Sequence, residues 1–155
     1  MVENMEGTLH PPRSILIIDD NEGDVVLMKE VLKESRFHSR ISVAKDGLEA
    51  MGALHDCGEL HKGSLPDIIF LDLSLPKVDG YQVLREIRSD PALRPIPVIV
   101  FTGSNAPADI RKAYDCGANC YIVKPIGLDI LEHTLKSVEE FWLGVAQLPN
   151  GRNAR

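Results

Sequence analysis

The sequence predicts an α/β fold in which a five-stranded parallel sheet carries helices on both faces. Five short runs rich in β-branched residues begin 26, 27, 30 and 23 residues apart. Most are apolar at every position, which is typical of strands buried on both faces of a parallel sheet. Right-handed crossovers between such strands give three layers. The expected strands are Ile15–Ile18, Ile41–Ala44, Ile68–Leu71, Val98–Phe101 and Tyr121–Val123.

Each strand is followed by a stretch with helical periodicity, in which apolar residues recur three and four positions apart. Gly47, Gly80 and Gly117 punctuate the turns between these segments. We therefore expect five helices that alternate with the strands. Their apolar faces are Val25, Met28, Val31 and Leu32; Leu48, Met51 and Leu54; Leu84 and Ile87; Ile110, Ala113 and Tyr114; and Leu131, Leu135, Val138 and Trp142.

Length and composition limit the classes of protein that need consideration. A chain of 155 residues suits one domain, which we place at residues 14–146 between mobile ends at 1–13 and 147–155. The net charge of −6 argues against sequence-independent binding of nucleic acid. The chain has no apolar run near the ~18 residues of a membrane helix. Its three cysteines, an odd number, indicate a reducing, cytoplasmic compartment.

Acids, a hydroxyl and a lysine stand where the predicted strands end. Asp19 and Asp20 follow the first strand, Asp72 the third, Thr102 the fourth and Lys124 the fifth. Carboxyl ends of parallel strands meet at one edge of the sheet, where ligands bind in such folds. Three carboxylates close together repel one another and need a cation or a shared proton. An all-oxygen ligand set favours a hard divalent ion, with Mg²⁺ the first choice.

The same residues suit the chemistry of a phosphoryl group. Lys124 would pair with one phosphoryl oxygen and the Thr102 hydroxyl would donate to another. A carboxylate can attack phosphorus and form an aspartyl phosphate, and Asp72 on the central strand is our candidate nucleophile. Taken singly, Asp19, Asp20 and Thr102 also suit helix caps and Asp72 also suits a turn, and a lone lysine before proline usually has no special role. The conjunction of four strand ends carries the hypothesis.

These residues resemble the receiver domain of two-component response regulators over residues 14 to 142. The matching segments are Asp19-Asp20, Ile68 to Pro76 with Asp79-Gly80 behind them, Thr102-Gly103 and Lys124-Pro125. The resemblance implies strand order 2-1-3-4-5, a flavodoxin-like three-layer sandwich, and a phosphoacceptor that catalyses only its own phosphorylation and dephosphorylation. It implies phosphoryl transfer from a histidine kinase to Asp72.

The resemblance also implies roles for individual residues. Asp20, Asp72 and the backbone carbonyl of Ser74 would hold Mg²⁺, with Asp19 acting through water. Lys124 and Thr102 would bind phosphoryl oxygens, and the bond between Lys124 and Pro125 would be cis. Tyr121 would be the switch aromatic that turns inward with Thr102. The responding surface would be the fourth helix, fifth strand and fifth helix, which include Asp109, Arg111, Lys112 and Tyr121.

A narrower resemblance concerns the stand-alone regulators that partner bacterial phytochromes. It is carried by the polar connection from Cys57 to Pro66 and by the segments Val138 to Leu143 and Gln147 to Pro149. It implies a phytochrome-type histidine kinase as partner and a homodimer through the fourth helix, fifth strand and fifth helix with Phe141. Phe141 lies on the helix face of Ile130 and Thr134, whereas Trp142 continues the apolar stripe and is expected in the core.

Other interpretations are weaker. A haloacid dehalogenase-type phosphatase also forms an aspartyl phosphate with Mg²⁺, but it needs a second Asp where this chain has Ser74. A flavin carrier needs a phosphate loop after the first strand, and the acidic segment Asp19 to Asp24 would repel the phosphate. His55, Cys57 and His61 match no zinc spacing, so we expect a solvated segment there.

Overall fold

The computed structural model describes residues 12–60 and 65–149, with the side chains of these residues except 56–60. Its sheet contains five strands that pair only in parallel, in the order β2-β1-β3-β4-β5. This arrangement confirms the predicted fold class and strand order. The strands are β1 (Ser14–Ile18), β2 (Arg40–Ala44), β3 (Ile68–Leu71), β4 (Val98–Thr102) and β5 (Cys120–Val123).

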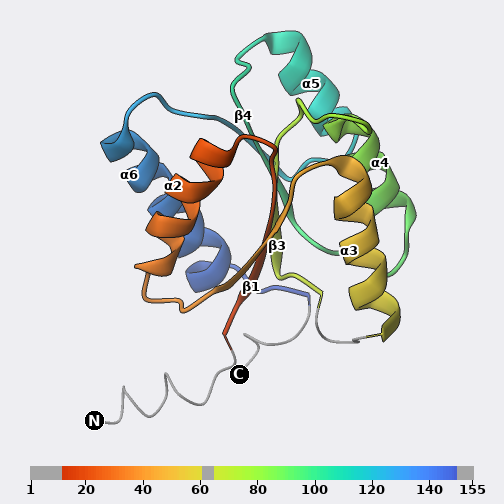
Figure 1. The fold of residues 1–155 in the computed structure, drawn as a ribbon, viewed down its shortest axis with the longest axis horizontal. Coiled ribbons are helices and arrows are strands. Elements are labelled where there is room, and N and C mark those ends of the chain that lie inside the picture. The colour runs from red at the N-terminus through yellow and green to blue at the C-terminus, as the bar shows by residue number, and fades with distance from the viewer. Residues whose placement is uncertain (1–11, 61–64, 150–155) are drawn as a thin grey trace.

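Helices cover both faces of the sheet and form the outer layers of a three-layer sandwich (Figure 1). On one face lie α2 (Glu22–Lys33) and α6 (Leu128–Glu139). On the other face lie α3 (Gly47–Leu60), α4 (Gly80–Ser89) and α5 (Pro107–Asp115). The crossover from β1 to β2 runs in one direction across the sheet, and the next three crossovers run in the opposite direction. Because each crossover is right-handed, α2 lies on one face and α3, α4 and α5 all lie on the other.

Alternating side chains of the central strands separate two apolar cores. In β1, Leu16 and Ile18 pack toward α3 and α4, whereas Ile15 and Ile17 pack toward α2 and α6. The same alternation continues in β3 and β4, and all of these side chains are buried. Burial on both faces is why the strand runs are apolar at every position. The edge strand β2 alternates instead between exposed and partly buried residues.

The predicted helix faces are correct except at two positions. Met28, Val31 and Leu32 of α2 are buried, as expected. Leu48 at the start of α3 is 60% exposed, and Tyr114 of α5 is 49% exposed, so placing them on the inner faces was wrong. In α3 the buried residues Ala50 and Leu54 define the inner face. Leu48 lies two residues before Ala50, about 200° away around the helix axis.

The last helix changes its winding in a way that apolar periodicity did not indicate. α6 continues directly into a π-helix, η1 (Glu140–Val145), in which the Ala146 amide donates to the Phe141 carbonyl at 2.7 Å. The wider turn brings Leu143 into the core, with Trp142 packed partly buried against it. Leu148 is also buried, so the packed chain extends past residue 146.

The mobility expected for the two ends of the chain stays a prediction, because residues 1–11 and 150–155 lie outside the described part. Within the described part, the structure contains no helix with the length and apolar character needed to cross a membrane. The segment at the carboxyl ends of β1, β3, β4 and β5 is fully described, and this is the edge that carries the predicted site.

Candidate functional site

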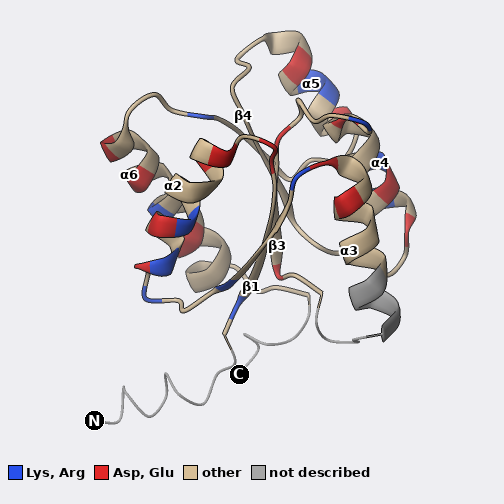
Figure 2. Ribbon diagram, viewed as in Figure 1, with Lys and Arg blue, Asp and Glu red and all other residues tan. Residues whose placement is uncertain are grey.

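The residues that follow β1, β3, β4 and β5 converge at one edge of the sheet. Asp19, Asp72 and Thr102 are buried there, while Asp20 is exposed. Figure 2 shows acidic residues where β1 ends and α2 begins, at the upper end of the sheet. Parallel register produces this convergence, because Ile18 of β1 pairs with Leu71 of β3 and Thr102 of β4 pairs with Val123 of β5.

Asp72 lies at the centre of the group and its side chain is held by three donors. Its Oδ1 accepts hydrogen bonds from the Thr102 hydroxyl at 2.7 Å and from the Ser74 amide at 3.2 Å. Its Oδ2 accepts a hydrogen bond from Lys124 Nζ at 3.1 Å. The Asp72 amide donates to the Ile18 carbonyl at 2.9 Å, which extends the ladder between β3 and β1 to this residue. The carboxylate therefore has a fixed position beside a hydroxyl and an ammonium group.

Lys124 contacts two further carboxylates. Its Nζ lies 2.9 Å from Asp19 Oδ2 and 2.8 Å from Asp24 Oδ2. Asp19 is oriented by the Asn21 amide, which donates to its Oδ1 at 2.9 Å. The lysine itself follows β5 directly, and its amide donates to the Thr102 carbonyl at 2.7 Å. One ammonium group is thus shared by Asp19, Asp24 and Asp72.

Burial and charge act in opposite directions on the ionisable groups of this site. Burial raises the pKa of Asp19 above its ordinary value, and the hydrogen bonds from Lys124 and the Asn21 amide oppose this shift. Burial by itself would lower the pKa of Lys124, but the hydrogen bonds to Asp24 and Asp19 raise it above its ordinary value. Three carboxylates contact the one ammonium group, and Asp20 lies close to two of them, so the site has more acidic than basic groups.

The same carboxylates have the composition and spacing of a divalent-cation site. One carboxylate oxygen from each of Asp19, Asp20 and Asp72 lies within 4.8 Å of one from each of the others. All of these donors are oxygens, which hard cations such as Mg²⁺, Ca²⁺ and Mn²⁺ prefer. The uncompensated negative charge also favours a cation here. The residues present therefore fit a divalent metal ion.

The absence of a side chain at Gly80 allows the start of α4 to pack closely against the loop that follows β3 and begins with Asp72 (the Asp72 loop). A Cβ at Gly80 would lie 2.6 Å from the Asp72 carbonyl oxygen and 2.6 Å from Leu73 Cα. The Gly80 amide donates to the Leu73 carbonyl at 3.1 Å, and the side chain of Asp79 caps the helix by accepting from the Gln82 amide. The start of α4 thus packs directly on the backbone of the candidate nucleophile.

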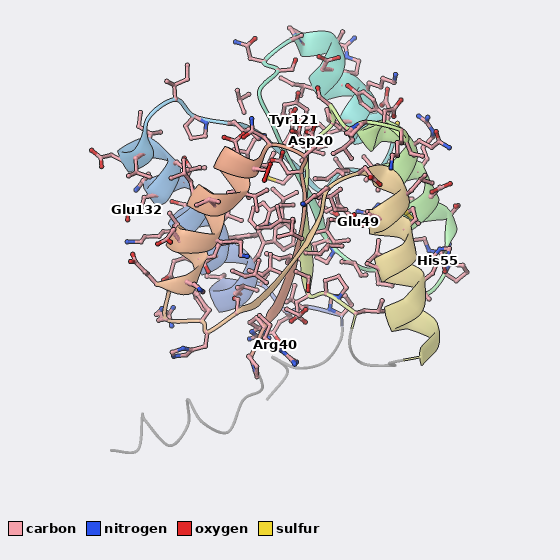
Figure 3. All side chains as sticks on the ribbon, in the orientation of Figure 1. Asp20, Arg40, Glu49, His55, Tyr121 and Glu132 are labelled. Atoms are coloured by element: carbon pink, nitrogen blue, oxygen red, sulfur yellow. The ribbon has the colours of Figure 1, made fainter. Side chains whose placement is uncertain are left out.

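A second hydrogen-bonded group lies beside the site and connects α4, α5 and β5 with the segment that follows β4. The Asp109 carboxylate of α5 accepts from the Ser104 hydroxyl at 2.6 Å and from the Tyr81 hydroxyl of α4 at 3.2 Å. The Tyr121 hydroxyl of β5 donates to the Ser104 carbonyl at 2.8 Å. In Figure 3, Tyr121 and Asp20 lie toward the same end of the sheet, with Arg40 at the opposite end. Ser104 follows Thr102 closely, so this group restrains the segment after β4.

The structure brings Asp19, Asp20, Asp72, Thr102 and Lys124 together, as the strand ends led us to expect. It corrects one detail, because no peptide bond in the described residues is cis and the Lys124–Pro125 bond is therefore trans, the isomer that X–Pro bonds favour by ~0.5–1 kcal/mol. Sequence reasoning missed Asp24 as a partner of Lys124. Its position in the first turn of α2, next to an acidic strand end, was the available indication.

The residues considered for a zinc site, His55, Cys57 and His61, lie partly outside the described part of the structure. His55 Nε2 lies 3.8 Å from Asp90 Oδ2, so its described ionic neighbour is a carboxylate. The side chain of Cys57 and all of His61 are not described. Cys116 and Cys120, both partly buried, are free thiols.

A sequence profile of the family described as "Response regulator receiver domain" matches residues 15–136. The chain belongs to the response regulator receiver domain family. Its matched segment contains all the residues of the site described above.

Two relatives are similar in sequence to this chain over most of its length. The response regulator Rcp1 of Synechocystis sp. is 39% identical over 145 residues, which are 94% of this chain and 99% of that protein. A probable methanogenesis regulatory protein, FilR2 of Methanothrix harundinacea, is 38% identical over 89% of this chain and 88% of its own.

Among solved structures, the phosphorylated cyanobacterial phytochrome response regulator RcpA is 44% identical, with a TM-score of 0.83. That comparison covers 90% of this chain and 99% of the RcpA chain. The Mn²⁺-bound form of Rcp1 is 40% identical, with a TM-score of 0.81, over 89% and 99% of the two chains. These similarities leave the phosphatase and flavin-carrier alternatives without support, and they identify a response regulator.

Proposed function

We propose that Asp72 accepts a phosphoryl group from the phosphohistidine of a histidine kinase. The observation that carries this proposal is the Asp72 carboxylate, which is fixed between the Thr102 hydroxyl and the Lys124 ammonium. In the transfer, a carboxylate oxygen of Asp72 forms a bond to phosphorus. The bond between phosphorus and the imidazole nitrogen breaks, and its electron pair stays on that nitrogen. Lys124 and Thr102 bind the equatorial oxygens, so catalysis rests on positioning and charge.

Mg²⁺ belongs to the same proposal. Asp19, Asp20 and Asp72 would hold it together with the backbone carbonyl of Ser74. The all-oxygen donor set and the excess negative charge support this assignment, as does the Mn²⁺-bound structure of the relative Rcp1. A bound divalent ion supplies positive charge that offsets the charge of the phosphoryl oxygens.

The partner we propose is a phytochrome-type histidine kinase in the cytoplasm. Support comes from the relatives, because RcpA is described as a cyanobacterial phytochrome response regulator and is similar over almost its whole length. The output we propose is a change of surface rather than turnover of a further substrate. Thr102 and Tyr121 would switch together. The segment from Gly103 to Pro107 would move with them and alter the surface along the β5 edge of the sheet, which α5, β5 and α6 form.

We also propose that this chain forms a homodimer through the same face with Phe141. Phe141 is 53% exposed and stacks edge-on against Trp142, with their ring centroids 5.2 Å apart. Phe141 also lines a surface hollow together with Val145, and exposed aromatic residues are typical of interface anchors. Sedimentation velocity should show a dimer that Phe141→Ser weakens. Val26→Ser, which removes an exposed apolar residue from α2, should leave the dimer intact.

Phosphorylation by a small donor tests the assignment of Asp72. The protein is incubated with Mg²⁺ and acetyl phosphate, and intact mass spectrometry follows the phosphoryl adduct. The adduct should form in the wild type and disappear in Asp72→Asn. Asp79→Asn is the matched control, because it lies in the same connection and its side-chain oxygen can still cap α4. An adduct that persists in Asp72→Asn would show that another residue is the acceptor.

Transfer from kinases tests the partner separately. A phytochrome-type histidine kinase and a histidine kinase of another sensor class are each autophosphorylated with labelled ATP and mixed with the receiver. We expect the label to move to Asp72 at least tenfold faster from the phytochrome-type kinase. Equal rates would contradict the proposed partner and leave the phosphoacceptor assignment unaffected.

A further inference from the structure

Asp24 is an acidic neighbour of Lys124 that the proposed phosphoacceptor chemistry does not require. It lies in the first turn of α2, where its amide donates to Asn21 Oδ1 at 2.9 Å and fixes the start of the helix. Its Oδ2 lies 2.8 Å from Lys124 Nζ, whereas Asp72 Oδ2 is 3.1 Å from the same nitrogen. Asp24 is thus at least as close a partner of the lysine as the candidate nucleophile.

Each N–H donor of the Lys124 ammonium group has a neighbouring carboxylate. The group has three N–H bonds, and three carboxylates lie within 3.1 Å of its nitrogen: Asp19, Asp24 and Asp72. A phosphoryl oxygen that binds Lys124 must therefore displace one of them. Asp19 is itself held by the Asn21 amide, and Asp72 carries the phosphoryl group. Asp24 has the most exposed side chain of the three, at 38%, so it is the carboxylate most easily released to water.

The surroundings allow Lys124 to change partners. A cavity of about 190 Å³ lies between α2 and the connection from β5 to α6, and Asp24, Leu27, Lys124 and Leu128 line it. The lysine side chain can therefore move without displacing packed atoms. The carboxylate of Asp24 also lies beside Lys124, which binds the phosphoryl oxygens in the proposed transfer, so its negative charge repels an anionic phosphodonor that approaches there.

We propose that Asp24 is a positioning residue that competes with the phosphoryl group for Lys124 and so slows phosphorylation of Asp72. The inference rests on the proposed function. Asp24 holds Lys124 before phosphorylation, releases it when phosphoryl oxygens arrive, and raises the barrier to the approach of an anionic donor. No bond other than hydrogen bonds changes at Asp24. The residue sets the rate of the response without entering the acceptor chemistry.

The test compares Asp24→Asn with Glu22→Gln. Asn keeps the size and the hydrogen-bond acceptor of Asp24 but removes its charge. Gln at position 22 removes a charge from the same turn of α2, where Glu22 is exposed, so it controls for the helix terminus and for general electrostatics. With acetyl phosphate and Mg²⁺, Asp24→Asn should be phosphorylated about tenfold faster than Glu22→Gln, whereas Asp24→Glu, which keeps the charge, should stay within about twofold of the wild type.

A second measurement needs neither metal nor phosphodonor. In the metal-free protein, ¹⁵N NMR of the Lys124 ammonium reports how fast its protons exchange with water. Exchange should be slow in the wild type and in Glu22→Gln, and clearly faster in Asp24→Asn. A purely structural role of Asp24 in capping α2 would not change this signal selectively.

The outcomes separate the two proposals. If the wild type is phosphorylated on Asp72 but Asp24→Asn reacts no faster than Glu22→Gln, the role of Asp24 is wrong and the phosphoacceptor function stands. If the wild type takes up no phosphoryl group, the proposed function fails. In that case, unchanged ammonium exchange in Asp24→Asn would also refute the pairing with Lys124.

Discussion

Glu139 occupies a buried position at the junction of α6 and η1, and this makes it unusual among the acidic residues. It is 1% exposed, and neither carboxylate oxygen has a hydrogen bond of ordinary geometry. Burial raises its pKa to about 6, and the nearby Ser35 hydroxyl offsets the shift only in part. At neutral pH the folded protein therefore holds an ionised carboxylate that lacks good partners.

Stability should fall as pH rises through the range between the two pKa values of Glu139. The unfolded chain loses this proton near the ordinary value of 4.5, whereas the folded protein keeps it to about pH 6. Stability from this group is complete below pH 4.5 and is lost by pH 7, by up to ~2 kcal/mol. Glu139→Gln should remove that part of the pH dependence. Urea unfolding at pH 4.5 and pH 7.5 measures it.

Glu132→Gln is the matched control for this measurement. Glu132 lies on the same helix, and it is only partly buried. Its replacement should leave the difference in stability between the two pH values as in the wild type. If Glu139→Gln also retained the full difference, Glu139 would not be the group that titrates.

At the scale of single residues, the sequence could reveal the site because strand ends have a predictable place. Asp19, Asp20, Asp72, Thr102 and Lys124 all follow runs whose apolar character marks them as parallel strands. Asp24 differs, since it belongs to a helix and its contact with Lys124 depends on how α2 is rotated above the sheet. Tyr81 and Asp109 also come from two different helices. No periodicity within one segment specifies such contacts.

At the scale of elements, the packing of α4 on the Asp72 loop couples a helix to the acceptor. Gly80→Ala places a methyl group 2.6 Å from backbone atoms of Asp72 and Leu73, so the helix or the loop must shift. We expect a loss of ~1–3 kcal/mol in unfolding free energy, as overpacking usually causes. Phosphorylation by acetyl phosphate should also slow, because Asp72 moves relative to Thr102 and Lys124. Thermal unfolding and intact-mass kinetics measure the two effects.

Gly52→Ala provides the comparison for Gly80→Ala. Gly52 lies inside α3, and a Cβ there would meet nothing within 4 Å. Alanine in a helix interior is favoured over glycine by ~0.5–1 kcal/mol, so this variant should be at least as stable as the wild type. Its phosphorylation rate should be unchanged. A Gly80→Ala variant that behaved in the same way would show that α4 does not support the acceptor loop.

Helix boundaries show a different limit of sequence reasoning. The stripe of Leu131, Leu135 and Val138 correctly predicts the buried face of α6. The same spacing continued to Trp142 assumes an unbroken α-helix, but η1 adds one residue to the turn and brings Leu143 inward. Hydrophobic periodicity identifies which face is buried only while the winding stays constant.

At the scale of the whole molecule, the distribution of charge concentrates repulsion at one edge of the sheet. Asp19, Asp24 and Asp72 contact Lys124, and Asp20 lies close to Asp19 and Asp72, while the net charge of the chain is −6. Burial of Asp19 and Asp72 strengthens this repulsion, since it removes them from water. The folded state is therefore destabilised by charge repulsion at the candidate site, and a cation that binds there would offset this repulsion only in the folded state.

Mg²⁺ should consequently raise the melting temperature of the folded protein. A ligand present at one hundred times its Kd stabilises the state that binds it by ~2.7 kcal/mol, which corresponds to a rise of about 5–10 °C for a domain of this size. Asp20→Asn should reduce that rise, because Asp20 is an exposed member of the carboxylate group. Asp79→Asn removes an acid that caps α4 outside the group, and it should keep the full rise. Calorimetry with Mg²⁺ and with a chelator measures the difference, and an equal rise in Asp20→Asn and the wild type would place the bound ion elsewhere.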